Sequence, residues 1–281
     1  MAETTKTIVT HISPDLDAIG SSWLIQRYMP EWDAAEHAFV PAGQTLDGTD
    51  PDADPNIIHV DTGLGKFDHH QLTERTSATK RVFDYLAAEG HIKEKDLLAV
   101  EHMVQFITEI DNFGEVHFPD PTNDRYTFCV HEFIYPLRGK LTSDTELVSM
   151  TFLILDSILF TIKNNLQAEE EIKEGLILKT KLGKTLIMET KNEAAIKYAL
   201  KSGYEVVVRK DPESGHVRIK TQPNEKYDLT KLYKKILQID GKASWFLHAS
   251  KNMLLNGSSK APDSVPSSLS LARIVEILKE M

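Results

Sequence analysis

The first half of the chain alternates short apolar runs with stretches of helical spacing. The apolar runs are typical of short buried strands and cover residues 7–10, 38–40 and 57–60. Apolar residues recur at helical spacing over residues 17–28, 77–88 and 95–110. Pro30 ends the first of these helices. Strands that alternate with helices predict an α/β fold with a mainly parallel sheet.

The pattern changes after a long helical segment. Residues from about 144 to 173 fit one long helix or two in tandem, and we interpret the second half as a connector between domains. Beyond Gly175 the chain mixes strand-like and helix-like stretches, which is typical of a smaller α+β domain. The strand-like stretches are 176–188, 205–209 and 216–221, and the helix-like ones are 192–201, 229–237 and 268–279. We therefore predict a first domain over 1–160, a helical linker over 161–175 and a second domain over 176–281.

The composition is typical of a soluble globular protein. With 281 residues, 41% of them apolar and 26% charged, the chain is long enough for two domains with a core in each. We find no apolar run near the roughly 18 residues that span a bilayer and no secretory signal, so we expect a cytoplasmic protein. Cys129 is the only cysteine, which excludes an intrachain disulfide and a zinc site built from thiolates.

Charge is divided unevenly along the chain. Residues 1–172 hold 12 basic and 30 acidic residues, a net charge of −18, whereas residues 173–281 hold 20 basic and 12 acidic ones, a net charge of +8. The basic half is either a small domain with solvated lysines or a surface that offers positive charge to an anionic substrate. In the second case the acidic half gathers carboxylates to hold cations. Charge alone favours the first interpretation.

Four segments of the first half place carboxylates or imidazoles at the ends of predicted strands and helices. They are His11 to Asp17, Asp61, Asp68 to His70, and Asp111. The carboxyl ends of strands in an open α/β sheet face a common crevice, so the first three segments can converge there. Two divalent cations about 3.5–4 Å apart require several carboxylates, including a shared one, and imidazoles complete such a site. These ligands suit manganese, magnesium or cobalt.

Together the four segments resemble the DHH phosphoesterase superfamily. This superfamily includes RecJ-type nucleases, nano-RNases, exopolyphosphatases and manganese-type pyrophosphatases. The segment His11-x-x-Pro14-Asp15-x-Asp17-Ala18-Ile19-Gly20-Ser21 is similar to the family's first motif. Asp61 is similar to its second motif, Asp68-His69-His70 to its third and Asp111 to its fourth. All four follow the family's order, which makes the set more specific than any single motif.

A closer resemblance is to the Myg-type exonuclease branch. Phe67-Asp68-His69-His70-Gln71, Ile110-Asp111-Asn112 and Phe246-Leu247-His248-Ala249-Ser250 are similar to segments of that branch. The first motif departs from it, because His11-x-x-x-Asp15-x-Asp17 has the spacing of the pyrophosphatases and nano-RNases.

The resemblance implies two metal ions held by six residues of the first domain. The implied cofactor is a pair of Mn²⁺ ions, with Mg²⁺ or Co²⁺ as alternatives. One ion is bound by His11 and Asp15, and Asp61 bridges it to the second ion. The second ion is bound by Asp17, His69 and Asp111.

The resemblance also implies three catalytic residues. His70 contacts the substrate phosphate or protonates the leaving group, and Asp68 orients the histidine pair from behind. Asp61 is the third, through its bridging position. The implied nucleophile is hydroxide activated by the metal pair, so no covalent intermediate is needed.

The second domain is expected to bind the substrate. Asn256-Gly257-Ser258-Ser259 is a small polar loop, and Pro266-Ser267-Ser268 precedes the last predicted helix, so backbone amides there can form an anion site. With His248 just upstream, the resemblance makes His248, Asn256, Gly257 and Ser258 candidate substrate contacts. Arg209, Arg218 and Lys220 lie on neighbouring predicted strands and can reach a phosphate chain, although ordinary solvated basic residues explain them equally well.

We therefore expect a metal-dependent phosphoesterase acting on short oligonucleotides or dinucleotides, and by resemblance a 3′-5′ exonuclease. The acidic chain lacks a large basic footprint, so the expected partner is a phosphorylated small molecule or a short single-stranded nucleic acid, without a membrane. The oligomeric state stays open, a homodimer included. A pyrophosphatase or exopolyphosphatase is the alternative, supported by Pro14-Asp15-x-Asp17. The third hypothesis is a non-catalytic relative that binds a nucleotide or metal.

Overall fold

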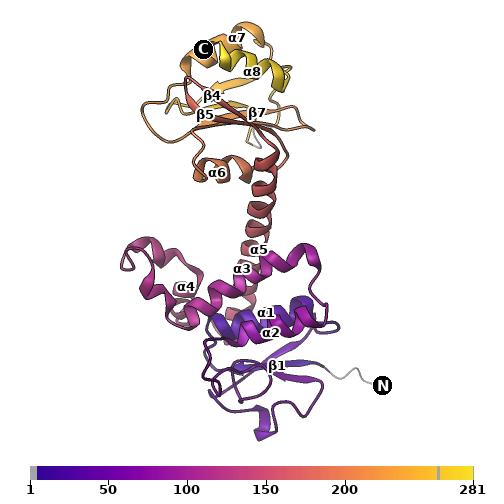
Figure 1. Cartoon of the computed structure of the whole chain (residues 1–281). Coiled ribbons are helices and arrows are strands. Elements are labelled where there is room, and N and C mark those ends of the chain that lie inside the picture. Colours follow the sequence, from indigo (N-terminus) through magenta and orange to yellow (C-terminus); the bar gives the residue numbers. More distant parts are fainter. Residues whose placement is uncertain (1–4, 258–259, 281) are drawn as a thin grey trace. The chain divides into compact units, whose positions relative to one another are not determined.

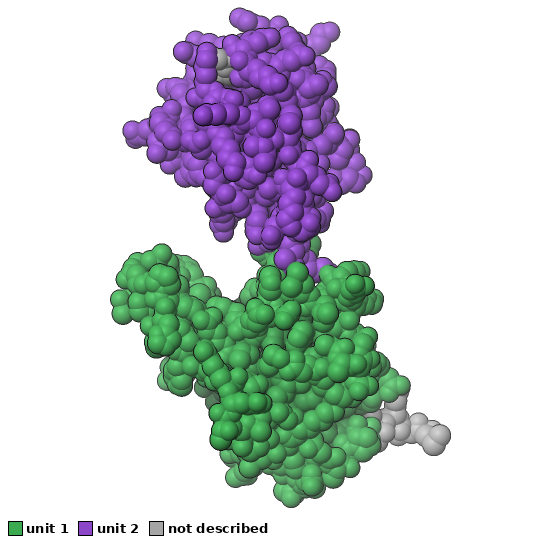
Figure 2. Space-filling model, in the orientation of Figure 1, with its two compact units in different colours: residues 1–162 green, residues 163–281 purple. Residues whose placement is uncertain are grey.

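The computed structural model describes residues 5–257 and 260–280 of the chain (Figure 1). The chain divides into two compact units, Met1–Ile162 and Lys163–Met281 (Figure 2). Each unit has a sheet of its own, of three strands in the first and six in the second.

Three parallel strands form the sheet of the first unit. In the order β2-β1-β3, β1 (Thr7–His11) lies between β2 (Glu36–Val40) and β3 (Ile57–His59). Ile8 and Val9 of the central strand are fully buried. The prediction of an α/β fold with a parallel sheet is confirmed for this unit.

Three helices pack together beside this sheet. α1 (Leu16–Tyr28) follows β1, while α2 (Ala78–Ala88) and α3 (Glu94–Asp111) come after β3. Gly20 of α1 allows a close approach, because a Cβ there would lie 2.8 Å from Thr79 Oγ1 and 2.9 Å from Ile107 Cδ1. The shorter helices of this unit are η1 (Leu46–Gly48), η2 (Gly114–His117), η3 (Asp124–Phe128) and α4 (Val130–Arg138).

A single long helix, α5 (Asp144–Glu174), follows, so the first of the two sequence alternatives holds. Its buried residues Leu147, Thr151, Leu155 and Leu159 recur every four residues and form one face. An 18-residue window of α5 has a mean hydropathy of 1.6, so α5 is long and apolar enough to cross a membrane by length and composition alone. Single polar residues interrupt this stretch, so no unbroken apolar run of about 18 residues marks it in the sequence. A core helix of a soluble domain passes the same test, although only 28% of this window is buried.

The second unit contains a mixed sheet in the order β4-β5-β6-β7-β9-β8. Its strands are β4 (Leu176–Thr180), β5 (Gly183–Glu189), β6 (Val206–Lys210), β7 (Val217–Thr221), β8 (Trp245–Leu247) and β9 (Met253–Asn256). Among the described strands of this sheet, only β5 and β6 pair in parallel. The predicted strand over 176–188 is in fact the hairpin of β4 and β5.

Helices lie on both faces of this sheet. α7 (Thr230–Ile239) and α8 (Leu271–Lys279) share one apolar core with β5, β6, β7 and β9. On the other face, α6 (Ala194–Lys201) and the end of α5 pack on β5 and β6. This arrangement confirms the predicted smaller α+β domain.

Substitution of Gly20 tests the packing of the first unit. We expect Gly20→Val to lower the free energy of unfolding by about 2 kcal/mol, because the added methyl groups have to displace Thr79 and Ile107. Gly139→Val is the matched control, since a Cβ at Gly139 meets only Pro136 O, at 3.7 Å. Denaturant unfolding measures both variants. Equal stability of the two would contradict the close contact.

Candidate metal centre

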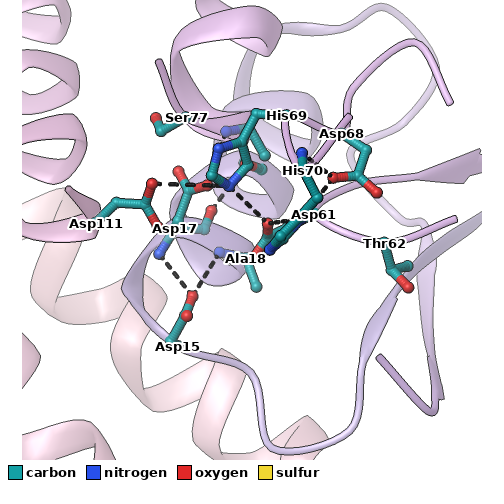
Figure 3. A network of polar contacts seen from close by, with 12 residues as sticks. Asp15, Asp17, Ala18, Asp61, Thr62, Asp68, His69, His70, Ser77 and Asp111 are labelled. Carbon is teal, nitrogen blue, oxygen red and sulfur yellow. Dashed lines mark hydrogen bonds and ion pairs between the residues drawn. The ribbon is translucent and has the colours of Figure 1, made fainter. Parts of the chain in front are cut away.

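A group of acidic and imidazole residues of the first unit gathers at the carboxyl ends of its parallel strands (Figure 3). His11 is the last residue of β1, and Asp61 follows β3 after one residue. Asp111 is the last residue of α3. Parallel strands end at one edge of a sheet, so segments that are far apart in sequence bring their side chains together there.

Asp61 lies at the centre of this group. Its Oδ2 is 3.3 Å from His11 Nε2, and its Oδ1 is 3.3 Å from His69 Nε2 and 3.7 Å from His70 Nδ1. The residue is buried, and its backbone has a positive φ of 55°. Such a conformation is uncommon for a residue other than glycine and marks a backbone held in place by its surroundings. Asp61 thus points one carboxylate oxygen toward His11 and the other toward His69 and His70.

Asp17 is fixed by the amino terminus of α2. Its carboxylate accepts hydrogen bonds from the backbone of Ala78, at 2.7 Å, and Thr79, at 2.9 Å. The free N–H groups and the dipole at a helix start stabilise a negative charge. His69 Nε2 lies 3.7 Å from Asp17 Oδ2 and 3.7 Å from Asp111 Oδ2. Asp17 and Asp111 therefore approach the His69 ring from two sides.

Asp15 caps α1 in a similar way. Its Oδ1 accepts hydrogen bonds from the backbone N–H groups of Asp17 and Ala18 at the start of α1, each at 3.0 Å. This capping interaction orders the loop between His11 and Asp15, and the same turn begins the helix that carries Asp17.

Ligand atoms of these residues form three overlapping groups in the described part of the chain. In each group, three atoms lie within 4.8 Å of one another: His11, Asp15 and Asp61; Asp17, His69 and Asp111; and Asp61, His69 and His70. The six residues to which the sequence resemblance assigned metal binding thus lie together around Asp61. This arrangement offers two neighbouring cation positions with Asp61 between them.

Two buried ligand atoms of this cluster have no hydrogen-bond partner among the described residues. They are Asp61 Oδ1 and His69 Nε2, which face each other across 3.3 Å. An unsatisfied buried polar atom is costly, and two on facing ligand atoms are typical of a site completed by an ion. Carboxylate oxygens and imidazole nitrogens are also the donors that divalent metals bind. The residues present therefore fit a divalent cation.

Protons are held tightly in this cluster. Burial and the nearby Asp61 and Asp111 raise the pKa of Asp17 to about 8. The interaction with Asp61 raises the pKa of His69 to about 9 against the effect of burial. For His11, burial lowers the pKa, but the opposite effects of Asp61 and of the Ile12 carbonyl are larger, so the pKa is raised to about 9. In the absence of a cation, the carboxylates of this cluster are thus balanced by protons on neighbouring groups.

Asp68 supports His70. Its fully buried carboxylate accepts hydrogen bonds from His70 Nδ1 at 2.7 Å, from the His70 backbone at 3.1 Å and from the Leu64 backbone at 2.7 Å. The His70 side chain is 60% exposed. It borders a pocket of about 270 Å³ together with His11, Asp15, Asp61 and Asp111. A buried carboxylate that fixes one ring nitrogen leaves the other available at the pocket.

The loop between His11 and Asp15 is also held from a distant segment. Ser13 has a positive φ of 63°, and its N–H donates to Asp144 Oδ2 at 2.8 Å. The Arg138 guanidinium donates to the carbonyl oxygens of Ser13 and Pro14. Sequence reasoning missed Arg138 and Asp144, because they lie more than 120 positions from the loop and no local motif signals them.

Two candidate substrate contacts in the second unit serve the fold instead. Arg209 is 2% exposed, and its guanidinium donates to the carbonyls of Thr190 and Lys191 and to Asp211. Asn256 is fully buried, and its amide donates to two backbone carbonyls while its oxygen accepts from the Ser267 backbone. Both side chains have their polar atoms satisfied inside the unit, so we do not retain them as substrate contacts.

The start of the last helix differs from the anion site that we expected there. α8 begins at Leu271, and its N-cap is Ser270, whose side chain accepts from the Arg273 backbone. Ser267 and Ser268 instead donate their hydroxyls to Asp240, at 2.6 and 2.8 Å. The predicted start at 268 was therefore wrong by three residues, because both serines bind a carboxylate that the sequence pattern does not reveal.

The other candidate substrate contacts of the second unit are Gly257, His248, Arg218 and Ser258. Gly257 has a φ of +78° and lies against the His216 ring, where a Cβ would come within 2.2 Å of Nδ1. His248 Nδ1 lies 2.9 Å from Ser250 Oγ. Arg218 forms an ion pair with Glu193 at 2.9 Å. Ser258 lies outside the described residues.

Comparisons with known proteins give distant structural similarity only. No protein-family model and no curated protein matches the chain. Three solved structures are similar over 98% of it: RecJ in complex with Mg²⁺ from Thermus thermophilus (10% identity, TM-score 0.36), an exopolyphosphatase-related protein from Bacteroides fragilis (14%, 0.26) and a putative family II inorganic pyrophosphatase from Methanococcus jannaschii (14%, 0.24).

The coverage of these three structures differs. The chain spans 49% of the RecJ chain, 91% of the exopolyphosphatase-related protein and 99% of the pyrophosphatase. RecJ proteins, exopolyphosphatases and pyrophosphatases are classes of protein that the sequence motifs also resemble. With TM-scores below 0.5 the similarity carries no functional argument, so the function has to be argued from the residues of the site.

Metal binding at this site should compete with protons. The pKa values of His11 and His69, about 9, and of Asp17, about 8, mean that these groups hold protons at pH 7 when no metal is bound. A cation takes the place of those protons, so we expect the affinity for Mn²⁺ to rise between pH 6 and 9. The rise should be about tenfold per pH unit for each proton released.

Calorimetric titration in two buffers of different ionisation enthalpy measures the number of protons released. An Mn²⁺ affinity that stays constant between pH 6 and 9 would contradict the assignment of these ligands.

Proposed function

We propose that the chain is a metal-dependent phosphoesterase of the DHH type that holds two divalent cations, Mn²⁺ first among them. The single observation that carries this proposal is the position of Asp61, whose two oxygens face two separate groups of ligand atoms. A carboxylate shared in this way is what a pair of cations about 3.5–4 Å apart requires. We further propose a cytoplasmic 3′-5′ exonuclease acting on short oligonucleotides or dinucleotides.

The two cation positions are divided between the residues as follows. His11 and Asp15 hold one cation together with Asp61, and Asp17, His69 and Asp111 hold the other. When bound, the cation pair supplies an activated water and the positive charge that stabilises the phosphoryl oxygens in the transition state. Asp15 and Asp17 are fixed by the first turns of α1 and α2, so the ligands are oriented before the cations arrive.

His70 is the proposed contact to the reacting phosphate. Asp68 fixes its Nδ1 at 2.7 Å, which turns the remaining ring atoms toward the pocket. In this position Nε2 can bind a phosphoryl oxygen or give a proton to the leaving oxygen. Asp68 acts only through His70, because its own oxygens are taken up by the His70 ring and by two backbone N–H groups.

A phosphodiester substrate fits better than pyrophosphate. Of the basic candidates in the second unit, Arg209 is buried and engaged with backbone carbonyls, and we do not find in the sequence the clustered Ser-Arg-Lys motif that pyrophosphatases carry in their second domain. The pocket beside His70 is small, about 270 Å³, and the first domain is acidic. Both features favour a substrate that presents one phosphate at its end. A non-catalytic relative is the weakest alternative, because every expected ligand is present.

A substrate panel with purified protein and Mn²⁺ tests this proposal. We expect turnover of dinucleotides and short labelled RNA or DNA oligomers, and little release of phosphate from pyrophosphate or polyphosphate. Fast pyrophosphate hydrolysis with inert oligomers would overturn the nuclease assignment. Bound metal without turnover of any substrate would favour a binding protein.

Asp61→Asn tests the role of the shared carboxylate. We expect the loss of at least about 10³-fold in kcat, because several kcal/mol of charge stabilisation depend on both cations. Asp33→Asn is the matched control: it removes the same charge from an exposed residue of the same unit and should leave the rate unchanged. Near-normal activity of Asp61→Asn would refute the site assignment.

A further inference from the structure

The apolar cluster on one face of the second unit's sheet involves only two of the described strands, β5 and β6. On this face, the apolar cluster that includes Ala168 and Ile172 of α5 and the helix α6 packs on Leu186, Met188 and Val207 of β5 and β6. No residue of β7, β8 or β9 belongs to that cluster in the described part of the chain. We call the β7–β9–β8 half, which carries no part of that apolar cluster, the open half of this face.

The strand register fixes which side chains occupy the open half. Ile219, Leu254 and Trp245 point to the opposite face, into the core beneath α7 and α8. Side chains alternate along a strand, so the residues between them lie on the open face. Phe246, Leu255 and Arg218 are cross-strand neighbours in one row. In the next row Lys220 pairs with Met253, and the His248 backbone donates to the Met253 carbonyl at 2.9 Å.

Phe246 is the aromatic member of this face. Its side chain is 57% exposed. The His248 ring lies 6.4 Å away, nearly perpendicular to it at 87°. Leu255 lies beside Phe246 and is only half-buried. One exposed aromatic ring is ordinary on a protein surface, but here the ring stands in a half-buried apolar row that continues toward two cations.

The two cations are Arg218 and Lys220, which lie on the same side of β7. Arg218 Nη1 binds Glu193 Oε1 at 2.9 Å; the Arg218 side chain is 16% exposed and the Glu193 side chain 61%. Lys220 has neither a hydrogen bond nor an ion pair among the described residues; burial and Arg218 lower the pKa of its ammonium group, and the charge of Glu193 opposes this effect. Two adjacent cations that share one exposed carboxylate leave positive charge available for an anion.

We propose that the open sheet face, formed by Phe246, His248, Leu255, Arg218 and Lys220, binds single-stranded nucleic acid by stacking a base on Phe246 and placing a phosphate at Lys220 and Arg218. Phe246 and Arg218 stand two strands apart, about 10 Å, a gap that the long arginine and lysine side chains can span. Stacking on an aromatic ring beside cations is the usual way in which proteins bind single strands. This proposal rests on the proposed function and deepens it, because it assigns residues of the second unit to the base and to the phosphate of such a ligand.

A ligand without bases would use only part of this face. Pyrophosphate or polyphosphate would contact Lys220 and Arg218 but leave Phe246 and Leu255 in water. The apolar row thus distinguishes a nucleic acid from a simple phosphate chain, which the metal centre by itself does not do.

Binding of a labelled DNA pentamer to the full chain, measured by fluorescence anisotropy, tests the proposal. A chelator is present, so hydrolysis and metal binding play no part. We expect Phe246→Ala to weaken binding about tenfold, since stacking of one base contributes about that much. Phe246→Trp should bind within about twofold of the unchanged chain. Phe128→Ala is the control for removal of an exposed ring, because Phe128 is 79% exposed and lies in the first unit.

Two further arms separate the base from the phosphate. An abasic pentamer of equal charge should compete about tenfold more weakly than the DNA pentamer. Lys220→Gln should reduce the slope of log affinity against log salt concentration by about 0.7, the value for one phosphate contact on a single strand. Unfolding curves of the variants confirm that each is folded.

The proposal is overturned if Phe246→Ala binds the pentamer as tightly as the unchanged chain, or if the abasic pentamer or tripolyphosphate competes as well as DNA. These outcomes are distinct from failure of the proposed function. A chain that binds the pentamer through Phe246 but hydrolyses nothing would refute only the phosphoesterase assignment.

Discussion

The repulsion among four carboxylates at the edge of one small sheet is the constraint on which the first unit depends. Asp15, Asp17, Asp61 and Asp111 approach one another through His11 and His69. Buried like charges raise each other's pKa and favour protonation, as Asp17 shows with a pKa of about 8. Without a counter-charge such a cluster would weaken the fold, so it is best understood as a site that divalent cations complete.

The fold prepares this cluster through the starts of its helices. Asp15 accepts from the first turn of α1, and Asp17 accepts from the first turn of α2. Each carboxylate thus caps a helix and faces the cluster at the same time. The positive end of a helix offsets part of the repulsion, and the close contact of α1 with α2 at Gly20 brings the second cap into place. The packing of α1 against α2 therefore also fixes the positions of these two carboxylates.

The site was largely predictable from sequence because its signals are local. His11 and Asp61 each follow a predicted apolar strand, Asp68 to His70 lie shortly after Asp61, and parallel strands end at one edge of a sheet. The second unit was less predictable, because burial decides there what a polar residue does. Arg209 resembles a surface cation in the sequence but lies fully inside, and Ser268 binds Asp240 instead of capping α8. Nor does any local pattern connect Asp144 with Ser13, 131 positions away.

The most direct measurement is the electron paramagnetic resonance spectrum of the chain with two equivalents of Mn²⁺. Two ions that share Asp61 at about 3.5–4 Å should give the multiline spectrum of an exchange-coupled pair, and Asp61→Asn should remove it. A stoichiometry of one, with the six-line signal of an isolated ion at every ratio of metal to protein, would contradict a site built around a shared carboxylate.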